Sequence, residues 1–588
     1  MNKKVINFLF YIYYIPIAKI FFRLYYILKR KLLENLNRSK YIDYFSFTSN
    51  LKIRNQCPQG NLFNKKQKTR SLPININLVG YPFKLSKNID WYPINLDHGT
   101  RLERLNLHYM DYLYELNIKN ALFIILKWIR EVPPYRENYW RDSWNCYALS
   151  IRIVNWIDII SKKEVINNFK NSKSISLINK SIEYQVDFLV SNLELDIKGN
   201  HLIKNIRCVF RASSYLSGDK TKKWIKLISK YLLQELKNQV LDDGMHFELS
   251  PSYHNLVIED LLCIRRSFLS LKEEINLTVF KEINNNLDIV IKKMYLAILK
   301  LTHPDGYPSL FNDGGLHSSL KPSKIVRYIK KEIKLKIIEE NYKSKKTWKL
   351  NYAGYYGLSS KNNYFITKCG NFGANSLPAH GQGDSLSFEW SVEGNRIIVD
   401  QGVFTYHPGL ERDFSRSTKA HNTLTLNDLD QTYFWSSFKA GRRATTKVIR
   451  FEEFKNSFFL EAFHDGYKFL RGNPLVFRSM KIEPNKIYFK DFVRSNFKHH
   501  VKNRILFAPD IVIKKLEYSE VNKFRCLLVL TKKKNLKTNL EFILQSEVKF
   551  KINDTFWYPD FGKKIKTKRI EFDLGYSPCS YNWSIVKI

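Results

Sequence analysis

The hydrophobic pattern changes its period near Tyr352, and this change limits the chain to two kinds of architecture in series. Between about residues 90 and 345, apolar side chains recur every three or four positions, as they do on one face of a helix. Clear examples are the stretches 121–130, 149–160, 222–240 and 255–270. After Tyr352, short segments rich in Val, Ile, Phe, Tyr and Thr alternate with turn clusters, a pattern typical of antiparallel strands. The sequence therefore predicts an α domain followed by a β domain.

The predicted strands are Tyr364–Thr367, Ser385–Val392, Arg396–Val399, Thr423–Leu426, Phe458–Phe463, Ile487–Val493 and Cys526–Leu530. Their turn-rich spacing favours an antiparallel β-sandwich over residues 346–588. Residues 90–345 are predicted to form a helical array, a toroid or a solenoid. Residues 51–89 are polar and contain Pro58, Gly60 and Pro73, so we expect a linker with little regular structure. The Lys-rich segment 328–348 is either a second linker or a solvated last helix.

The charge of the chain favours an anionic partner. Its 588 residues contain 96 Lys and Arg against 55 Asp and Glu, a net charge of +41. Nucleic acid, an acidic membrane surface and an acidic polysaccharide all fit this charge, as does a simple bias of composition. No RNA-binding signature, zinc-finger spacing or long basic tail is present, so we predict no nucleic-acid partner. The oligomeric state is left open.

Other features of composition exclude several classes of protein. Aromatic residues make up 15% of the chain, which excludes a disordered or fibrous protein. The seven cysteines are spread singly, which excludes a dense disulfide scaffold and the usual thiolate zinc modules.

The first 33 residues carry seven basic side chains and no acidic one, and residues 8–18 form an unbroken apolar run. This run is too short to span a membrane. Residues 1–50 are therefore predicted to be a signal-like segment, an interfacial amphipathic helix that contacts a membrane through residues 1–33, or a buried first helix. We expect a periplasmic or cell-envelope location, with association with the cytoplasmic membrane as the alternative.

Four clusters concentrate polar residues that can carry chemistry. In the first, Asn200 and His201 follow Gly199 and open a helical stretch whose positions 200, 204 and 207 share one face. Asn at such a position is most often a helix cap.

In the second cluster, Ser250 followed by Pro251 predicts a helix start, with Tyr253 and His254 in the first turn. The positive end of the helix would lower the pKa of the Tyr253 phenol, although an amphipathic Tyr at a helix end explains the segment equally simply.

The third and fourth clusters follow in the predicted β domain. His380 stands in a glycine-rich loop with Gln382 and Asp384, where core packing explains it poorly. The fourth cluster contains Asp400, Tyr406, Arg412, Arg416 and His421. The two arginines can clamp carboxylates or sulfates of a ligand, or can pair with Glu411 and Asp413.

The span from about residue 90 to 445, which contains these clusters, has seven segments that resemble the heparinase II/III family of polysaccharide lyases. The segments are IDWYPINLDHGTRLERLNLHYMDYL, SIRIVNWI, GNHLIKN, DGMHFELSPSYHNLVIEDLL, HPDGYPSLFNDGG, PAHGQGDSLSFEWSVEGNRIIVDQG and RSTKAHNTLTLNDLDQT. The resemblance implies an (α/α) toroid followed by a β-sandwich. It also implies β-elimination on a uronic-acid chain such as a glycosaminoglycan or alginate, in which the C5 proton is removed and the C4 oxygen is expelled.

The resemblance also implies roles for individual residues. Asn200 would neutralise the substrate carboxylate, Tyr253 would act as base or acid at the cleaved bond, His380 would be its partner, and His201 would be a second base. Arg412, Arg416, Tyr406 and His254 are predicted to bind substrate. No cofactor is required.

One departure from the family concerns a metal. The family's loop usually reads His-x-His-x-Asp, and here Gln382 stands at the second His, while Asp400 and His421 remain. Because Gln is a poor zinc ligand, we expect at most a structural zinc or calcium ion held by Asp400, His421 and Gln382.

Two other functions remain open at this stage. A uronate C5-epimerase would use the same proton abstraction without expelling the leaving group. A non-catalytic glycan-binding protein of capsule or envelope polysaccharide assembly would keep the fold without turnover.

Overall fold

The computed structural model describes residues 3–37, 51–54, 57–58, 60–61, 66–94, 102–169, 172–333, 347–360, 362–515, 524–530, 539–544 and 548–588. Contacts divide the chain into two units. The strand-rich unit comprises Met1–Ile15, Val240–Leu256 and Lys292–Ile588, and the helical unit comprises Pro16–Gln239 and Val257–Ile291. Residues 240–256 and 292–333, which the sequence groups with the helices, therefore group with the strands. Residues 38–50 of the N-terminal segment, 95–101 of the first family-like segment and 334–346 of the Lys-rich segment lie outside the described residues.

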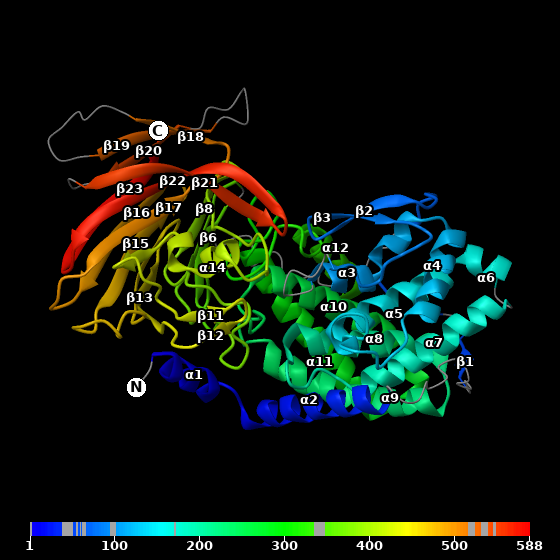
Figure 1. The fold of residues 1–588 in the computed structure, drawn as a ribbon. Helices are drawn as coiled ribbons and strands as arrows, with labels where there is room; N and C mark the ends of the chain where they lie inside the picture. The colour runs from blue at the N-terminus through cyan, green and yellow to red at the C-terminus, as the bar shows by residue number, and fades with distance from the viewer. Residues whose placement is uncertain are drawn as a thin grey trace. The chain divides into compact units, whose positions relative to one another are not determined.

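The helices of the chain are concentrated before residue 334 (Figure 1). They are α1 (Lys3–Tyr13), α2 (Ile17–Asn37), α3 (Leu102–Tyr109), α4 (Ile118–Glu131), α5 (Cys146–Ile160), α6 (Lys163–Phe169), α7 (Lys173–Val190), α8 (Gly199–Ser213), α9 (Asp219–Gln239), α10 (Pro251–Leu269), α11 (Leu277–Lys300), α12 (Pro322–Ile333) and the short α14 (Leu410–Arg416). The predicted helical stretches match α4, α5, α9 and α10, so the periodicity was read correctly.

The helices of the helical unit begin at polar caps and bury one apolar face. The Asn117 side chain accepts a hydrogen bond from the Asn120 N–H at 2.9 Å and so caps α4. Trp128 of α4 packs edge-on against Trp156 of α5, with ring centroids 5.5 Å apart. The buried Arg152 guanidinium lies 3.9 Å above the Trp128 ring. Aromatic packing of this kind joins neighbouring helices into one core.

The segment predicted as a linker contains regular structure, which corrects the prediction. Strands β2 (Ile74–Leu78) and β3 (Tyr81–Leu85) form an antiparallel hairpin. Its turn places Val79 and Gly80 at positive φ, and the Asn77 side chain accepts a hydrogen bond from the Gly80 N–H at 2.6 Å. The alternation of Ile74, Ile76 and Leu78 with polar residues is the local sequence signal for this strand.

Two further pairs of short strands are present. In the helical unit, β1 (Lys52–Ile53) pairs with β4 (Leu216–Ser217), and in the strand-rich unit, β11 (Phe434–Ser436) pairs with β12 (Lys439–Ala440).

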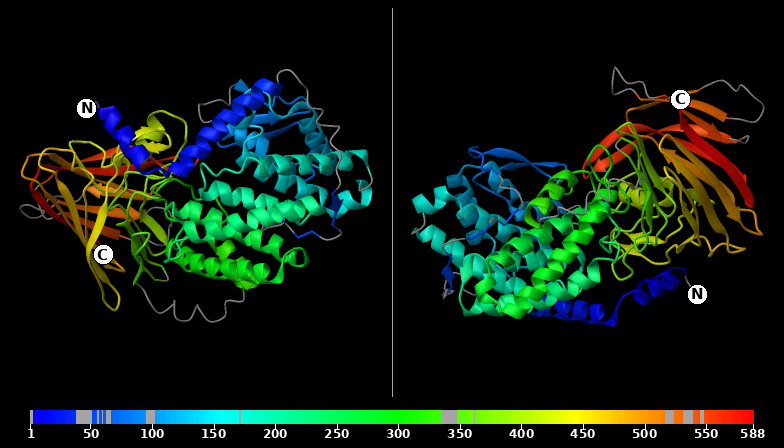
Figure 2. Two further views of the ribbon diagram at one scale, coloured as in Figure 1. Left: turned by 90° about the horizontal axis from the view of Figure 1, so that it is seen from below. Right: turned by 180° about the vertical axis from the view of Figure 1, so that it is seen from behind.

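Three antiparallel sheets form the larger part of the strand-rich unit (Figure 2). The first has the order β5 (Thr347–Leu350), β6 (Tyr355–Ser359), β7 (Tyr364–Lys368), β8 (Phe388–Val392) and β9 (Asn395–Ile398). The second has the order β10 (Leu424–Leu426), β17 (His500–Leu506), β22 (Lys563–Tyr576) and β21 (Lys549–Asp560). The third has the order β13 (Thr446–Glu453), β14 (Phe458–His464), β15 (Leu475–Glu483), β16 (Lys486–Arg494), β23 (Cys579–Lys587), β20 (Asn539–Leu544), β19 (Phe524–Leu530) and β18 (Ile511–Lys515).

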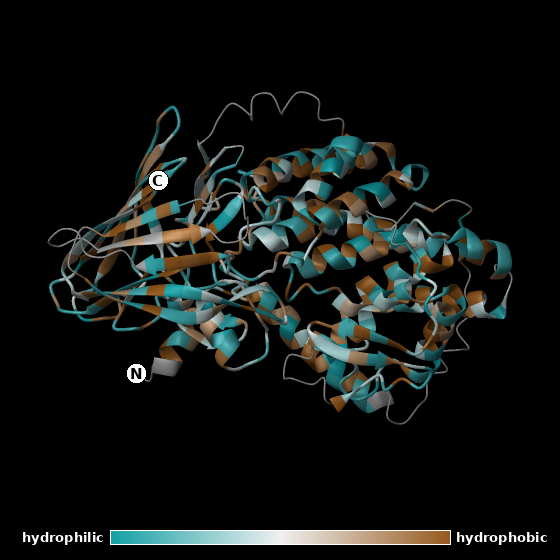
Figure 3. Cartoon of the chain, turned by 90° about the horizontal axis from the view of Figure 1, so that it is seen from above, coloured by the Kyte–Doolittle hydropathy of each residue, from teal (hydrophilic) through white to brown (hydrophobic). Residues whose placement is uncertain are grey.

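One apolar core joins these sheets. Hydrophobic and hydrophilic bands follow one another along the strands in Figure 3, and in β16 buried residues alternate with more exposed ones, so that one face of this strand is buried. Phe388 of β8 packs against Phe489 of β16 at 4.7 Å between ring centroids, and Phe489 stacks on Trp583 of β23 at 4.2 Å. Each predicted strand falls on an observed one, which confirms a helical part followed by an antiparallel β-sandwich.

The buried ion pair between Arg478 and Asp491 attaches two loops to this core. Arg478 Nε donates to Asp491 Oδ1 at 2.6 Å, and Arg478 Nη1 donates to the carbonyls of Leu386 and Asn422 at 2.7 and 2.8 Å. Both charged side chains are fully buried. A buried charge that loses its partner is strongly destabilising.

We therefore expect Arg478→Gln to lower the free energy of unfolding of the strand-rich unit by roughly 3–5 kcal/mol. Arg450→Gln, at an exposed position of β13, is the matched control and should change it by less than about 0.5 kcal/mol. Urea denaturation followed by tryptophan fluorescence measures both. Equal midpoints for the two variants would contradict the structural role of Arg478.

Candidate functional site

The start of α10 places Tyr253, as the Ser250–Pro251 pair predicts. Ser250 Oγ accepts a hydrogen bond from the Tyr253 N–H at 3.1 Å and donates one to the Asp313 carbonyl at 2.6 Å. The capping serine thus fixes the first turn of the helix and attaches it to the loop that carries Asp313. Tyr253 is half-buried, so its phenol is held in place while part of it remains accessible.

Three predicted site residues meet in the strand-rich unit. The Tyr253 and His380 rings stack with their centroids 3.9 Å apart and an interplanar angle of 27°. The hydroxyls of Tyr253 and Tyr406 lie 2.9 Å apart, within hydrogen-bond distance. Tyr406 is buried, and burial raises the pKa of its phenol well above the usual value. This arrangement gives one partly exposed phenol a neutral phenol and an imidazole as direct neighbours.

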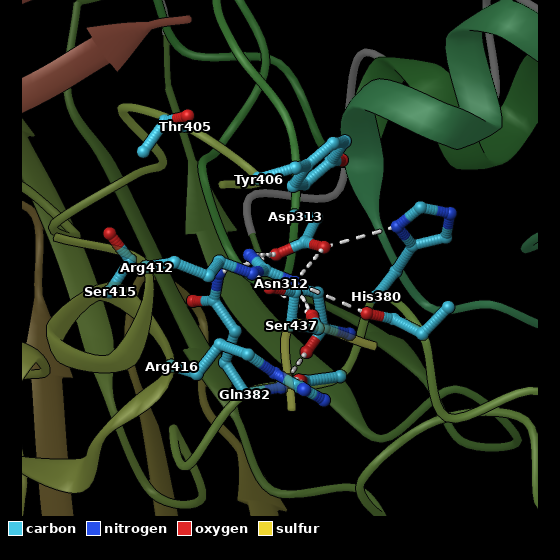
Figure 4. Close-up of polar contacts among 12 residues, drawn as sticks. Asn312, Asp313, His380, Gln382, Thr405, Tyr406, Arg412, Ser415, Arg416 and Ser437 are labelled. Carbon is cyan, nitrogen blue, oxygen red and sulfur yellow. Dashed lines mark hydrogen bonds and ion pairs between the residues drawn. The ribbon is translucent and has the colours of Figure 1, made fainter. Parts of the chain in front are cut away.

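His380 is oriented by a carboxylate that the sequence analysis did not single out. His380 Nδ1 lies 3.1 Å from Asp313 Oδ2. Arg412 grips the same carboxylate with two hydrogen bonds, Nη1 to Oδ1 at 2.7 Å and Nη2 to Oδ2 at 2.8 Å. Gln382 Nε2 donates to Asp313 Oδ1 at 2.9 Å. Figure 4 shows Asp313 at the centre of this group, with Arg412, Gln382 and His380 turned toward it.

The environment of Asp313 keeps its carboxylate ionised. Burial by itself raises the pKa of Asp313, but Arg412 beside it and the hydrogen bond from His380 hold the pKa well below its usual range. Asp313 and Arg412 are both fully buried. A buried acceptor that is ionised at neutral pH therefore faces one nitrogen of His380, which fixes the orientation of the imidazole.

A second carboxylate faces the other side of the same ring. Glu248 Oε2 lies 3.4 Å from His380 Nε2, and Glu248 is buried. Sequence reasoning missed both carboxylates as functional candidates. For Asp313, the two glycines that follow it were a sequence signal of a functional turn. For Glu248, the only signal was its position two residues before the Ser250–Pro251 helix start.

The backbone around these carboxylates is held in uncommon conformations. Leu249 and Asn312 both have positive φ, at 55° and 60°. The Asn312 amide donates to the Leu249 carbonyl at 2.9 Å, and so does the Tyr355 hydroxyl at 2.7 Å. Gly314 has φ +156°, and a Cβ there would lie 2.3 Å from Ser252 Oγ. Strained residues of this kind persist where surrounding contacts fix them and are common at functional sites.

The predicted substrate-binding role of the two arginines is wrong. Arg412 is fully buried and its guanidinium is engaged by Asp313 and by the Ser437 carbonyl at 2.7 Å. Arg416 is also buried, and it donates to the carbonyls of Pro378 and Gly381, both at 3.0 Å. Arg416 therefore holds the loop that carries His380. The alternative pairing with Glu411 and Asp413 is not used by either guanidinium.

His254 does not bind substrate either. It is fully buried, its Nε2 lies 3.1 Å from the Met294 carbonyl, and its Nδ1 accepts a hydrogen bond from the His246 N–H at 3.3 Å. Burial lowers the pKa of His254 to about 3, so the ring is neutral. Because successive residues of a helix point in different directions, Tyr253 and His254 cannot both face the same site.

The residues expected to hold a metal do not form such a site. His421 Nδ1 and Asp400 Oδ2 lie 2.9 Å apart and pair with each other, whereas the Gln382 amide binds Asp313. Nearby, the buried Lys368 ammonium contacts Asp384 at 2.5 Å and already supplies a positive charge. Among the described residues, no group of three or more His, Cys, Asp or Glu side chains is placed to hold a metal ion. The donor set does not fit zinc or calcium.

The helical unit carries the remaining two predicted residues, Asn200 and His201, in the first turn of α8. Asn200 is buried. His201 Nδ1 lies 2.9 Å from Glu194 Oε1, and its ring packs on the Tyr147 ring at 4.5 Å between centroids. Glu194 also accepts a hydrogen bond from the Asn205 amide at 3.0 Å, which fixes the carboxylate.

Two of the three positions of α8 predicted to share a face, 204 and 207, have a common partner. Lys204 Nζ and Arg207 Nη1 both donate to Asp260 Oδ1 at 2.7 Å. Asp260 belongs to α10, so this ion-pair cluster attaches α8 to α10. Convergence of Asn200 with the Tyr253–His380 pair on one ligand remains a prediction.

Family models match both parts of the chain. Residues 75–335 match the model described as "Heparinase II/III N-terminus", and residues 343–584 match "Heparinase II/III-like, C-terminal". A heparin-sulfate lyase of Pedobacter heparinus is 28% identical over 273 residues, which are 42% of this chain and 38% of that protein. A heparin-sulfate lyase of Bacteroides thetaiotaomicron is 24% identical over 377 residues, 58% of this chain and 52% of that protein. The chain thus aligns with about half, or less, of each relative's length.

Solved structures share the fold. A crystal structure of heparinase III superposes with a TM-score of 0.64 at 17% identity and covers 85% of this chain and 79% of that one. Heparan sulfate lyase HepC of Pedobacter heparinus gives a TM-score of 0.53 at 18% identity, with coverage of 95% and 87%. At this identity the likeness establishes the fold, a toroid followed by a sandwich.

We expect Asp313→Asn to lower the free energy of unfolding at neutral pH by roughly 3–5 kcal/mol, because it leaves the buried Arg412 charge without its partner. The folded-state pKa of Asp313 is depressed, so its contribution is full above the unfolded value of about 3.9 and disappears as pH falls through the folded value. The difference between the native chain and the variant should therefore shrink as pH is lowered from about 5 toward 2.

Urea midpoints measured at several pH values test this expectation. Asp554→Asn, at an exposed position, is the matched control and should follow the native chain throughout. A difference between Asp313→Asn and the native chain that stays constant with pH would show that the carboxylate is not held ionised by Arg412.

Proposed function

Because the chain belongs to the heparinase II/III family, we propose that it is a polysaccharide lyase that cleaves a uronic-acid-containing polysaccharide by β-elimination. The observation that carries this proposal is the Tyr253 phenol, which is partly exposed, stacked on His380 and within 2.9 Å of the Tyr406 hydroxyl. A phenol held between an imidazole and a second phenol is suited to move a proton at a bound ligand.

The reaction sets three chemical demands. The proton at C5 of a uronic acid is weakly acidic, so the neighbouring carboxylate must be neutralised to stabilise the charge that develops on it. A base must remove that proton, and an acid must protonate the C4 oxygen as it leaves. No covalent intermediate is required.

In this proposal Tyr253 acts at the cleaved bond. Tyr406 holds its hydroxyl by the 2.9 Å hydrogen bond, and the raised pKa of Tyr406 keeps this neighbour protonated. His380 packs against the Tyr253 ring and is oriented by Asp313 and Glu248. Tyr406, expected to contact substrate, thus gains a second role as the direct neighbour of the reacting phenol.

Asn200 and His201 supply the remaining functions. An amide can donate hydrogen bonds to the substrate carboxylate without adding a charge, which is the role assigned to Asn200. His201 is the candidate second base, and Glu194 fixes its ring orientation through the 2.9 Å contact at Nδ1. The net charge of +41 favours a polyanionic substrate by long-range attraction.

The test of this function is incubation of the full chain with a panel of uronic-acid polysaccharides, with heparan sulfate first because the curated relatives are heparin-sulfate lyases. We expect ultraviolet absorbance from a new C4–C5 double bond with at least one polymer. Inversion at C5 without new chain ends would instead identify an epimerase, and tight binding with neither change would identify a glycan-binding protein. Either of these two outcomes would overturn the lyase proposal.

Removing the Tyr253 hydroxyl should abolish turnover. We expect Tyr253→Phe to lower kcat by about 10²–10⁴-fold while leaving glycan binding within a few-fold, because proton transfer at the reacting bond contributes about that much. Initial rates and isothermal titration calorimetry measure the two effects. Tyr576→Phe, at an exposed position of the strand-rich unit, is the control and should retain full activity. Unchanged kcat in Tyr253→Phe would remove this phenol from the mechanism.

A further inference from the structure

Helices α1 and α2 present apolar side chains outward, which is the reverse of the usual arrangement at a protein surface. On α2 five exposed apolar residues recur at intervals of three or four and so lie along one face of the helix. They are Ile17, Phe21, Leu24, Leu28 and Leu32, with exposed fractions of 86, 64, 56, 69 and 60%. Tyr25 and Ile27 of the same helix are exposed as well. On α1 the exposed apolar residues are Val5, Phe8, Leu9, Phe10, Ile12 and Tyr13. Contiguous exposed apolar surface of this kind marks a site of interaction.

The opposite face of α2 is attached to the helical unit by polar contacts. The buried Tyr26 hydroxyl donates to the Leu193 carbonyl at 2.6 Å, and Lys19 Nζ donates to the Ile197 carbonyl at 2.9 Å. Glu34 Oε1 accepts a hydrogen bond from the Asn138 N–H at 2.7 Å. The polar side of this amphipathic helix therefore faces protein, and its apolar side faces outward.

Helix α1 is attached to the strand-rich unit in the same manner. Asn7 is buried, and its Oδ1 accepts a hydrogen bond from the Arg442 N–H at 3.3 Å. Gly441 allows this approach, because a Cβ there would lie 2.9 Å from Asn7. The Phe8 ring packs against Trp435 at 5.9 Å between centroids. Such fitted contacts belong to a segment that is part of the folded protein, whereas a signal peptide is removed.

The charge of this segment identifies the chemistry of its occupant. Residues 1–33 contain seven basic side chains and no acidic one. On α2, Arg23 and Lys31 are exposed beside the apolar face. Among the described residues no single helix is long and apolar enough to cross a membrane, and α1 and α2 meet that test only when taken together across the bend between them. An apolar helix face flanked by cations is the composition of a helix that lies in the interface of an anionic bilayer.

We propose that residues 3–37 are retained in the mature protein and that the outward faces of α1 and of α2 each bind the surface of an anionic lipid bilayer. These two faces, which we term the N-terminal apolar faces, consist of the exposed apolar residues of α1 and of α2 named above. The proposal does not depend on the lyase activity, because none of these residues belongs to the candidate site. It places the chain at a membrane surface.

Co-sedimentation of the full chain with vesicles tests the proposal. Vesicles of phosphatidylcholine mixed with phosphatidylglycerol should bind the chain at least tenfold more tightly than vesicles of phosphatidylcholine alone. Added salt should weaken this binding, because the attraction of exposed charges is screened. This comparison uses the unaltered chain, so it is informative even if a variant fails to fold. Absence of binding to the anionic vesicles, or equal binding to both kinds, would overturn the proposal.

Substitutions locate the binding surface. The double substitution L24E/L28E should weaken anionic-vesicle binding at least tenfold, with an unchanged circular dichroism spectrum and unchanged turnover of any substrate found. The matched control, I289E/I449E, places the same charges on exposed apolar residues elsewhere and should bind as the native chain does. Normal vesicle binding by L24E/L28E would overturn the proposal. So would light scattering that showed a native dimer converted to a monomer by L24E/L28E, since a second copy would then be the occupant.

Discussion

The ion pair between Asp313 and Arg412 is the interaction on which the candidate site depends. It lies fully out of water, and both oxygens of the carboxylate accept hydrogen bonds from the guanidinium. Buried charges are tolerated only when paired and fully hydrogen-bonded. The pair meets that condition by drawing in His380, Gln382 and the Ser437 carbonyl as further partners. Segments distant in the sequence are thereby fixed to one carboxylate, and the orientation of the His380 imidazole is a consequence of this packing.

Local signals in the sequence predicted the local parts of the site. Ser250 and Pro251 marked the start of α10 correctly, because capping is decided by neighbouring residues. The glycine-rich loop of His380 was identified for the same reason, and the Tyr253–His380 contact followed the family resemblance. What failed were pairings over long distances in sequence. Arg412 was expected to bind a ligand or an adjacent acid, and its partner is Asp313, 99 residues away.

The same limit explains the other corrections. The sequence shows that His254 follows Tyr253, but not that Met294 and His246 enclose it in the core. The periodicity of α4, α5 and the strands was sufficient to predict most of the fold, since burial of one face is a local pattern. The β2–β3 hairpin was missed because its strands are short and lie in a polar segment. A metal site was predicted from residue types alone. In the structure, the buried Asp384 carboxylate is paired with Lys368, and the buried Asp400 carboxylate is paired with His421.

The positive charge of the chain and the chemistry of its candidate site are separate properties. Around Tyr253, the cation of Arg412 is matched by Asp313, and Glu248 adds a further negative charge near His380. The site within the strand-rich unit therefore offers no free cation to a substrate carboxylate from these residues. In the proposed lyase reaction, attraction of a polyanion would come from the exposed lysines and arginines, whose effect is long-ranged and screened over about 8 Å at physiological salt. Neutralisation at the sugar would then require short-range hydrogen bonds, which is the role proposed for Asn200. Long-range charge and short-range uncharged donors would thus serve two separate steps of that reaction.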